Sequence, residues 1–390
     1  MKKSLIAFAV LGAFAASASA QSSVTIYGIV DAAATYATNQ NPAGGNKVSM
    51  EVGQLLTSRW GIKGSEDLGG GLKANFNLEG TLFNDTGAAG SSFGGGNVST
   101  GTASNLFDRL SWVGLSGDFG AVLLGRNNTL GVESVGLADP LSLAHAPSNP
   151  NVAFSALNVG ALFGSFGTNT GGTELRQNNS IKYQTPMYSG FGAAFMHGFG
   201  EKAGDTSASS YTGVSSYFTD GKSGVALAYA ELKDTTGTGK LTQWGGGAKF
   251  KMDDMLTFRA TYAQTEVNAA AQVLINHRKI AVFGAGVDVA LSPTTTVTGA
   301  YYDSKRSGDL AGSIKVDQFI IMPKYAFSKR TTAYASYTYS KADKTLLDPT
   351  KATSAVAGAN AVADLTMALG LFGAGQSNGS RLMVGVLHAF

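Results

Sequence analysis

Apolar and polar side chains alternate with a period of two along much of this 390-residue chain. In residues 23–36, SVTIYGIVDAAATY, Val24 and Ile26 share one parity, whereas Thr25 and Tyr27 share the other. Successive side chains of a β-strand point to opposite faces, so each such run separates an apolar environment from a polar one. The pattern therefore predicts strands with two unlike faces.

Strand-like runs of this kind recur as far as the C-terminus. We place sixteen of them, at roughly 23–37, 50–63, 71–83, 105–117, 120–127, 175–184, 191–199, 210–219, 222–232, 242–251, 256–266, 279–289, 295–304, 314–325, 331–341 and 380–390. The connections alternate between short ones, such as 117–118 and 220–221, and long ones, namely 84–104, 128–174 and 342–379. An even strand number, short turns at one end and longer loops at the other are typical of bacterial outer-membrane barrels. The predicted fold class is all-β, a 16-stranded antiparallel transmembrane β-barrel.

The composition agrees with a membrane location. Charged residues make up 14% of the chain, against ~25% in typical soluble domains. Beyond the first 20 residues no segment is a clean apolar run of the ~20 residues that a spanning helix needs. The alternative, a secreted β-sandwich or a Gly-rich solenoid, also alternates, but it explains neither the strand number nor the sorting of loop lengths.

The N-terminus has the order of a secretory signal peptide. Lys2 and Lys3 precede an apolar stretch at 5–16, and small residues occupy 18–20. We expect residues 1–20 to be the cleaved signal peptide and 21–390 to form a single barrel domain. Loss of the two lysines takes the formal charge from +3 to +1, which gives no support for a nucleic-acid partner.

The titratable residues form no catalytic or metal-binding pattern. The chain has no cysteine, which excludes disulfides and thiolate chemistry. Its four histidines, His145, His197, His277 and His388, lie in unrelated segments. We therefore expect no enzyme activity, no cofactor and no metal. One alternative, a barrel-embedded hydrolase, would need a Ser/His/acid set that we cannot assemble from this sequence. Another, a pore-less adhesin or structural barrel, would conduct no ions, so single-channel recording would distinguish it from a diffusion channel.

Three segments carry a resemblance to a known family. SRWGIKGSEDLGGGLKA (58–74), FDRLSWVGLSGDFGAVLLGR (107–126) and RQNNSIKYQTPMYSGF (176–191) resemble general porins of β-proteobacteria, as do the opening SSVTIYGIVDA (22–32) and the terminal Phe390. The resemblance implies a 16-stranded barrel whose third external loop folds into the lumen. It also implies a homotrimer in the outer membrane, surrounded by lipid and lipopolysaccharide. Small hydrophilic solutes and ions would pass through it by passive diffusion.

Strand parity selects candidate residues of the lumen. In SRWGIKG, Trp60 and Ile62 would face lipid or a neighbouring subunit, and Arg59 would face water. Arg109 and Arg176 have the same lumen parity on other predicted strands, with Leu110 and Trp112 opposite Arg109. The resemblance implies that Arg59, Arg109 and Arg176 form one basic wall of the constriction, facing acids on the infolded loop, for which Glu133 and Asp139 are the candidates. Rings of basic side chains favour anions, so we expect a mild anion preference.

Two further residues have predicted places on the outside. Arg126 has the parity of Val122 and Leu124, which points it outward, either into a trimer interface or above the membrane at the end of a strand. Phe390 shares a face with Leu382 and Val384 and should belong to a girdle of aromatic residues at the membrane interface.

Overall fold

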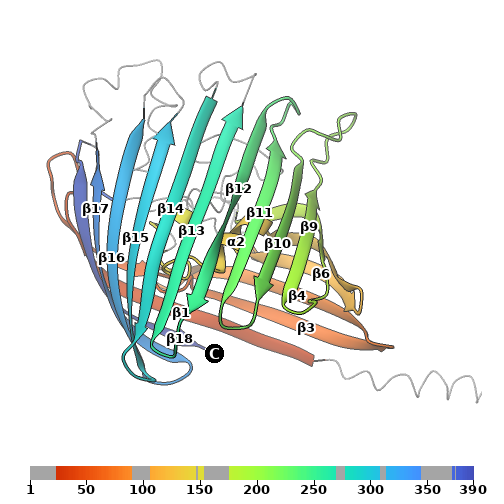
Figure 1. Cartoon of the computed structure of the whole chain (residues 1–390), viewed down its shortest axis with the longest axis horizontal. Helices are drawn as coiled ribbons and strands as arrows, with labels where there is room; N and C mark the ends of the chain where they lie inside the picture. The colour runs from red at the N-terminus through yellow and green to blue at the C-terminus, as the bar shows by residue number, and fades with distance from the viewer. Residues whose placement is uncertain are drawn as a thin grey trace, which may run out of the picture.

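The computed structural model is a β-barrel with short turns at one end and longer connections at the other (Figure 1). It describes residues 23–89, 106–145, 148–152, 175–268, 277–307, 313–343, 371–373 and 375–390. The predicted signal peptide, 1–20, lies outside these residues, as does much of the three long loops, so the cleavage site stays a prediction. Within the described part, no helix is long and apolar enough to cross a membrane.

The strands follow one another around the barrel in sequence order. They are β1 (Ser23–Ala37), β2 (Lys47–Val52), β3 (Arg59–Gly69), β4 (Leu72–Phe83), β5 (Ala88–Ala89), β6 (Leu110–Gly117), β7 (Gly120–Asn128), β8 (Arg176–Gln184), β9 (Phe191–Gly198), β10 (Tyr211–Thr219), β11 (Gly224–Lys233), β12 (Lys240–Lys251), β13 (Leu256–Asn268), β14 (His277–Ala290), β15 (Thr295–Ser307), β16 (Ile314–Ala326), β17 (Thr331–Ala342) and β18 (Asn378–Ala389). All pairings are antiparallel, and β18 pairs with β1 to close the ring.

Eighteen labelled strands make sixteen barrel strands. The strands β2 and β3 pair with opposite halves of β1, so together they form one barrel strand that is broken at 53–58. The two-residue β5 pairs only with the end of β4. The predicted 16-stranded antiparallel barrel is therefore confirmed, and the run predicted at 50–63 is this broken strand.

A buried carboxylate holds the break between β2 and β3. Asp31 of β1 accepts hydrogen bonds from the backbone N–H groups of Leu55, at 2.6 Å, and Leu56, at 2.9 Å, and from the Tyr334 hydroxyl at 2.7 Å. Gly53 opens the break with φ +67°, a conformation that favours glycine. The freed backbone groups are thus satisfied by side chains instead of by a neighbouring strand.

The two faces of the barrel follow the predicted alternation. On β1, Val24 and Ile26 are 67% and 66% exposed on the outer face, whereas Asp31 and Thr35 are buried on the inner one. On β18, Leu382, Val384 and Val386 are exposed in the same way. Such an apolar outer surface is stable in an apolar environment, and the hydrocarbon core of a membrane provides one.

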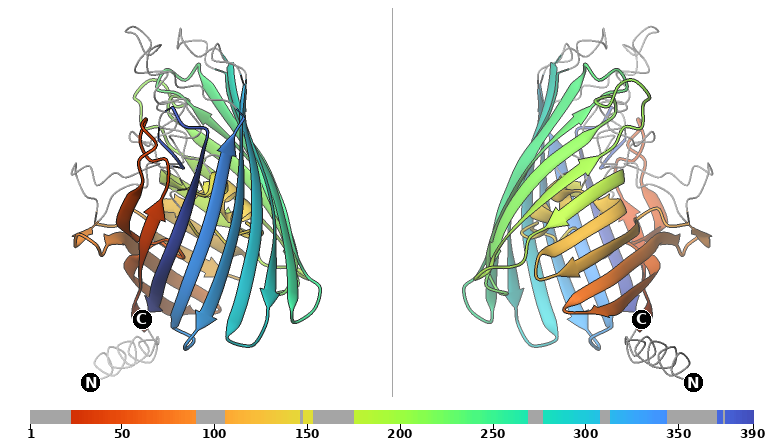
Figure 2. Two further views of the ribbon diagram at one scale, coloured as in Figure 1. Left: turned by 90° about the vertical axis from the view of Figure 1, so that its left-hand side faces the viewer. Right: turned by 90° about the vertical axis from the view of Figure 1, so that its right-hand side faces the viewer.

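The first part of the connection between β7 and β8, as far as residue 152, lies inside the barrel (Figure 2). It begins with the short helix α2 (Leu130–Gly136), which packs against β9 to β13. Residues 137–145 and 148–152 continue along the inner wall, where Asn151 Nδ2 donates to Thr261 Oγ1 of β13 at 2.8 Å, and together with α2 they form the inner segment. Leu130, Leu141 and Ala144 of this segment share an apolar cluster with inward-facing residues of the wall, among them Met196, Val282 and Met322.

Candidate functional site

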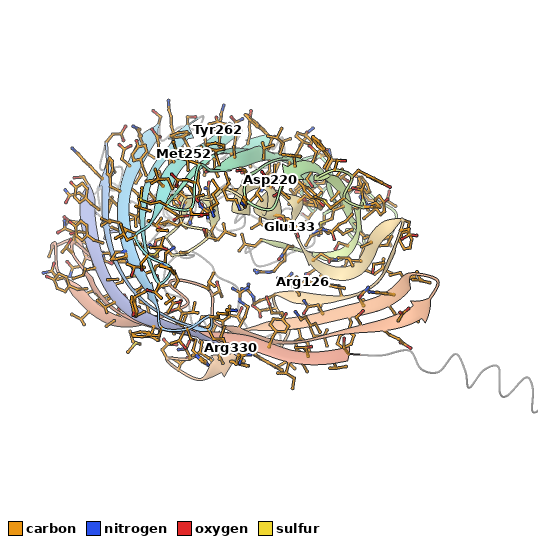
Figure 3. All side chains as sticks on the ribbon, turned by 60° about the horizontal axis from the view of Figure 1, so that its bottom comes forward. Arg126, Glu133, Asp220, Met252, Tyr262 and Arg330 are labelled. Carbon is orange, nitrogen blue, oxygen red and sulfur yellow. The ribbon has the colours of Figure 1, made fainter. Side chains whose placement is uncertain are left out.

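A cavity of about 410 Å³ lies between this inner segment and the barrel wall opposite it. Arg59, Arg109 and Arg176 line it, together with Glu133 of α2. The three arginines that sequence parity selected are thus brought to one place from three different parts of the wall. Figure 3, which looks through the barrel from its short-turn end, shows Glu133 inside the ring of strands.

Each arginine stands where a strand begins. Arg59 is the first residue of β3, directly after the break, and its Nε donates to the Thr57 carbonyl at 2.9 Å. Arg109 lies in a bend just before β6, and Arg176 is the first residue of β8. The three cationic groups are therefore positioned by the ends of strands, next to a break or a loop. Pairing with the neighbouring strands sets their level along the barrel axis.

An acid on the wall, rather than on the loop, contacts two of the arginines. Glu79 of β4 accepts a hydrogen bond from Arg109 Nε at 2.6 Å, and its Oε1 is 3.9 Å from Arg59 Nη1. The Tyr27 hydroxyl donates to the other carboxylate oxygen at 3.0 Å. Sequence reasoning assigned Glu79 no role in advance, because strand parity fixes the face of a residue and not its partner.

Glu133 pairs with a cation that sequence reasoning also left without a role. The Lys182 ammonium of β8 donates to Glu133 Oε1 at 2.5 Å, and the Lys182 side chain is only 2% exposed. The lining of the cavity itself holds three arginines and one carboxylate, that of Glu133, a surplus of two positive charges. Lys182 alternates with the outward Ile181, which is the signal that would have found it.

Asp139 does not join this cluster. It is fully buried against the far wall, where it accepts hydrogen bonds from the Tyr302 hydroxyl at 3.0 Å and from Asn151 Nδ2 at 2.7 Å. Burial raises the pKa of this carboxyl, while the hydrogen bonds from Asn151, Asn149 and the Leu143 N–H oppose the rise. Asp139 therefore anchors the inner segment to β15 and does not face the arginines.

The facing of β6 differs from the prediction. Trp112 pairs directly with Asn77, and directly opposite residues share a face. Both line a second cavity of the lumen wall together with Lys63, so Trp112 faces inward and Val113, 57% exposed, faces outward. The strand begins only at Leu110, so counting parity from Phe107 assigned the faces the wrong way round. Arg109 reaches the lumen because it lies in the bend before the strand.

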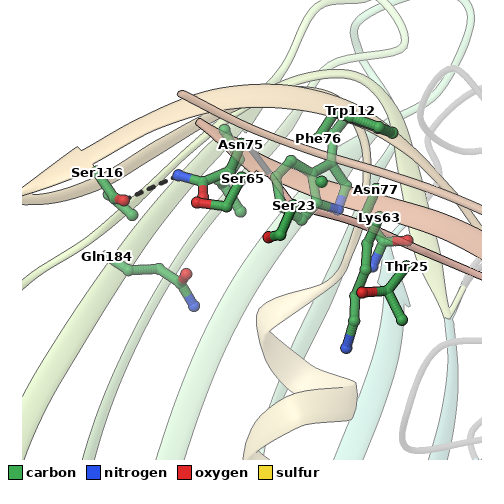
Figure 4. A pocket seen from close by; sticks show the side chains of 13 residues that line it. Ser23, Thr25, Lys63, Ser65, Asn75, Phe76, Asn77, Trp112, Ser116 and Gln184 are labelled. Atoms are coloured by element: carbon green, nitrogen blue, oxygen red, sulfur yellow. Dashed lines mark hydrogen bonds between the residues drawn. The ribbon is translucent and has the colours of Figure 1, made fainter. Parts of the chain in front are cut away.

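The second cavity, of about 460 Å³, is lined by amide and hydroxyl side chains together with the apolar Phe76, Trp112 and Leu123 (Figure 4). Asn75 Nδ2 donates to Ser116 Oγ at 2.9 Å, and the Lys63 ammonium lies 5.1 Å from the centre of the Tyr27 ring. These amide, hydroxyl and ammonium groups offer donors and acceptors to water on this part of the lumen wall.

Arg126 and Phe390 were both predicted on the outside. Arg126 pairs with Ser111, in register with the outward Val113–Leu124 pair. Its guanidinium has partners in its own chain, the Asp108 carbonyl and Asn178 Oδ1, both at 2.5 Å. The Phe390 ring lies against Gly28 of β1 so closely that a Cβ there would be 2.2 Å from it. A trimer contact by Arg126 and a girdle position of Phe390 stay predictions.

A closed antiparallel barrel with an apolar outer face and charged and amide groups along its lumen defines a membrane channel of the outer-membrane type. The chain belongs to the Gram-negative porin family, whose model matches residues 7–345. It forms a water-filled channel for passive diffusion across the outer membrane of a Gram-negative bacterium, and it is not an enzyme. The resemblance drawn from the sequence is thereby confirmed.

Named relatives and solved structures agree with this assignment. The chain is 38% identical to outer membrane porin protein 32 of Delftia acidovorans over 244 residues, which cover 61% of this chain and 62% of that protein. It is 27% identical to an outer membrane porin protein of Bordetella pertussis, over 87% of this chain and 94% of that one. Among solved structures, the anion-selective porin from Comamonas acidovorans matches with a TM-score of 0.73 and 25% identity, covering 95% of this chain and all of that one.

Proposed function

We propose that this channel favours anions and that Arg59, Arg109 and Arg176 set the preference at the constriction of the lumen. The observation that carries the proposal is the surplus of positive charge in the lining of one cavity, where three arginines stand against one carboxylate, that of Glu133. A basic surface beside a narrow aqueous path raises the local concentration of anions, and low-dielectric walls strengthen that effect. The similar Comamonas porin is named as anion-selective.

The contacts of Arg59 and Arg109 predict which of the two substitutions changes ion selectivity more. Arg59 is 3.9 Å from Glu79 and partly exposed, so Arg59→Gln removes a charge with little structural cost. Arg109 is 6% exposed and hydrogen-bonded to Glu79, so Arg109→Gln also releases a carboxylate into the lumen. Arg109→Gln should therefore shift selectivity toward cations more than Arg59→Gln, and Glu79→Gln should shift it toward anions.

Reversal potentials in a salt gradient across planar bilayers test this proposal. Arg59→Gln, Arg109→Gln and Arg176→Gln should each move the reversal potential toward cations at 0.1 M salt. The shift should shrink at 1 M, where the Debye length falls from ~10 Å to ~3 Å. Lys251→Gln, at a short turn beside Asp254, is the matched control and should change little. Wild-type selectivity in all three arginine variants would disprove the basic wall.

We further propose that three copies assemble through the outer face of β1, β3 and β6. The exposed side chains there are mainly aliphatic, such as Val24, Ile26, Val113 and Leu115. The outer face of β9 to β17 carries the aromatic residues that a lipid interface favours, among them Phe195, Tyr229, Trp244, Phe258, Tyr262, Phe319 and Tyr337. An outer-membrane protein of Vibrio cholerae with the same fold, TM-score 0.61, is described in a trimer form.

A further inference from the structure

The second cavity of the lumen is lined by rows of side chains from neighbouring strands. Directly paired residues share a face of the sheet, so each row points into the lumen as a unit. The first row crosses β1, β3, β4 and β6 and consists of Thr25, Lys63, Asn77 and Trp112. The second row lies one step nearer the short turns and contains Ser23, Ser65 and Asn75. Gln184 of β8 adds a third amide to the lining.

Hydrogen bonds within the wall orient the two asparagine amides. Asn75 Nδ2 donates to Ser116 Oγ at 2.9 Å, and Asn77 Oδ1 is 2.8 Å from the Tyr27 hydroxyl, from which it accepts. Asn75 Oδ1, Asn77 Nδ2 and the Gln184 amide have no hydrogen-bond partner among the described residues. The wall thus presents an acceptor and a donor about 7 Å apart along β4. A hydroxyl group both donates and accepts, so a molecule with several hydroxyls matches these amides.

The Trp112 indole supplies an apolar surface in the same row. The ring belongs to the lumen side, because the next residue, Val113, is exposed on the outer face. Gly125 is directly opposite Trp112 on β7, and Gly114 is the next residue of β6 on the same face. Neither glycine has a side chain that could cover the indole. The face of an aromatic ring is electron-rich, so it attracts the weakly positive C–H groups of a sugar ring.

Lys63 provides a cation in this row. It is exposed, its ammonium lies 5.1 Å from the centre of the Tyr27 ring, and it has no ion-pair partner among the residues that the structure describes. Asn77 lies between Lys63 and Trp112 in the register, so the lysine and the indole are two strands apart, about 10 Å at the usual strand spacing. A sugar ring with an anionic group at its edge spans this distance, because the lysine stem is long and flexible.

We propose that this cavity is a subsite of the channel for a sugar ring that carries one anionic group, either a uronate or a sugar phosphate. The ring stacks on Trp112, its hydroxyls hydrogen-bond to the three amides, and its anionic group pairs with Lys63. Asn77 lies two residues from Glu79 on the short-turn side, which is the periplasmic side of such barrels. A solute from outside therefore reaches the subsite after the constriction. The inference rests on the proposed anion preference for the entry of the solute, and not for its binding.

Tryptophan fluorescence of the protein in detergent tests the proposal, because the chain has three tryptophans. The background variant Trp60→Phe/Trp244→Phe keeps Trp112 as the reporter. Glucuronate and glucose 6-phosphate are the probes, and at least one should change the Trp112 emission saturably. Adding Lys63→Gln should weaken that binding roughly 3- to 5-fold, the effect of losing one exposed ion pair. The matched control Lys249→Gln removes a cation of β12 that does not line the cavity and should bind as the background does.

Calorimetry with the same probes tests the aromatic surface. Trp112→Leu should weaken binding roughly 3- to 10-fold, because the ring loses its stacking partner. Trp244→Leu changes a tryptophan that is exposed on the outer face and should leave the affinity unchanged. Heat-modifiable migration confirms that each variant is folded. Equal affinities of the two variants would show that the sugar ring does not lie on Trp112 and would overturn the proposal.

Two further ligands separate the chemical alternatives. Glucose, which lacks an anionic group, should bind the background about as weakly as glucuronate binds the Lys63→Gln variant, and an affinity equal to that of glucuronate would overturn the anionic assignment. Cyclohexanecarboxylate lacks the hydroxyls and should bind more weakly than glucuronate; equal affinity would overturn the sugar assignment. Absence of binding by both probes would overturn the subsite altogether.

The arginine cluster is the competing place for the anionic group. Loss of glucuronate binding in Arg59→Gln, but not in Lys63→Gln, would place the anion at the constriction and overturn the subsite. The binding measurements use no ion flow, whereas the anion preference is tested by reversal potentials. Failure of one proposal is therefore distinguishable from failure of the other.

Discussion

At the scale of a single residue, His145 links the docking of the inner segment to the break between β2 and β3. His145 is 2% exposed, and its backbone N–H donates to the Gln54 carbonyl at 2.5 Å, which ties the segment to the break between β2 and β3. Its Nε2 has no hydrogen-bond partner among the described residues. Burial, and secondarily the nearby Arg381 guanidinium, lower the pKa of His145 to about 3.

This histidine should weaken the docking of the segment in acid. A histidine freed into water has a pKa near ~6.5, so protonation below that pH favours the undocked segment. The docked state resists protonation until about pH 3, and between pH 6.5 and pH 5 it should lose roughly 2 kcal/mol. Asp139 acts in the opposite sense, because its raised pKa stabilises docking as the pH falls.

Comparison with His145→Gln isolates the histidine from Asp139, which both proteins share. Hydrogen exchange of residues 137–145 should lose protection between pH 7 and pH 5 in the wild type, after correction for intrinsic rates. His145→Gln should lose less, by a factor of about ten or more. The same pH profile in both proteins would show that His145 does not control docking.

At the scale of the element, the inner segment is held by a polar anchor as well as by its apolar contacts. Asp139 accepts hydrogen bonds from Tyr302 of β15, and the Tyr302 oxygen accepts one from the Leu141 N–H at 3.2 Å. Tyr302→Phe should weaken docking by about 1–2 kcal/mol, because a buried carboxylate and a buried N–H each lose a partner. Tyr301→Phe, on the outer face of the same strand, is the matched control.

The absence of cysteine from the chain makes this prediction measurable. Ala144 is 1% exposed, so a thiol introduced by Ala144→Cys should react slowly with a water-soluble maleimide. Adding Tyr302→Phe should speed that reaction roughly 5- to 30-fold, the factor that corresponds to the expected loss of docking free energy. Adding Tyr301→Phe should leave the rate unchanged, and equal rates in all three proteins would mean that the anchor contributes nothing.

Elements and lumen residues differed in how far the sequence could predict them. Alternation located the barrel strands and put Arg59 on the lumen side, because lipid outside and water inside leave no other arrangement. It assigned the faces of β6 wrongly, since the bend at 106–109 leaves no trace in the alternation. The roles of Glu79 and Lys182 depend on which elements lie next to one another, and the role of Asp139 depends on how the inner segment folds. A period-two pattern contains neither kind of information.

At the scale of the whole molecule, the outer surface has two unlike halves. One half, on β9 to β17, carries the aromatic residues of a lipid interface, and the other, around β1, β3 and β6, exposes mainly aliphatic side chains. A barrel that met lipid on all sides would have no reason for this difference. The proposed trimer explains it, because the aliphatic half would be buried between subunits.

A pair of charged substitutions tests the trimer. Ile26 is the fourth residue of β1 and Leu227 the fourth of β11, and they are 66% and 60% exposed on the two halves of the outer face. Ile26→Lys should dissociate the trimer in mild detergent, because it would bury an unpaired charge between subunits at a cost of several kcal/mol. Leu227→Lys should leave the trimer intact, because detergent headgroups and water can reach the ammonium. Light scattering gives the mass, and heat-modifiable migration confirms that both barrels are folded. A wild-type monomer, or equal masses for the two variants, would contradict assembly through β1.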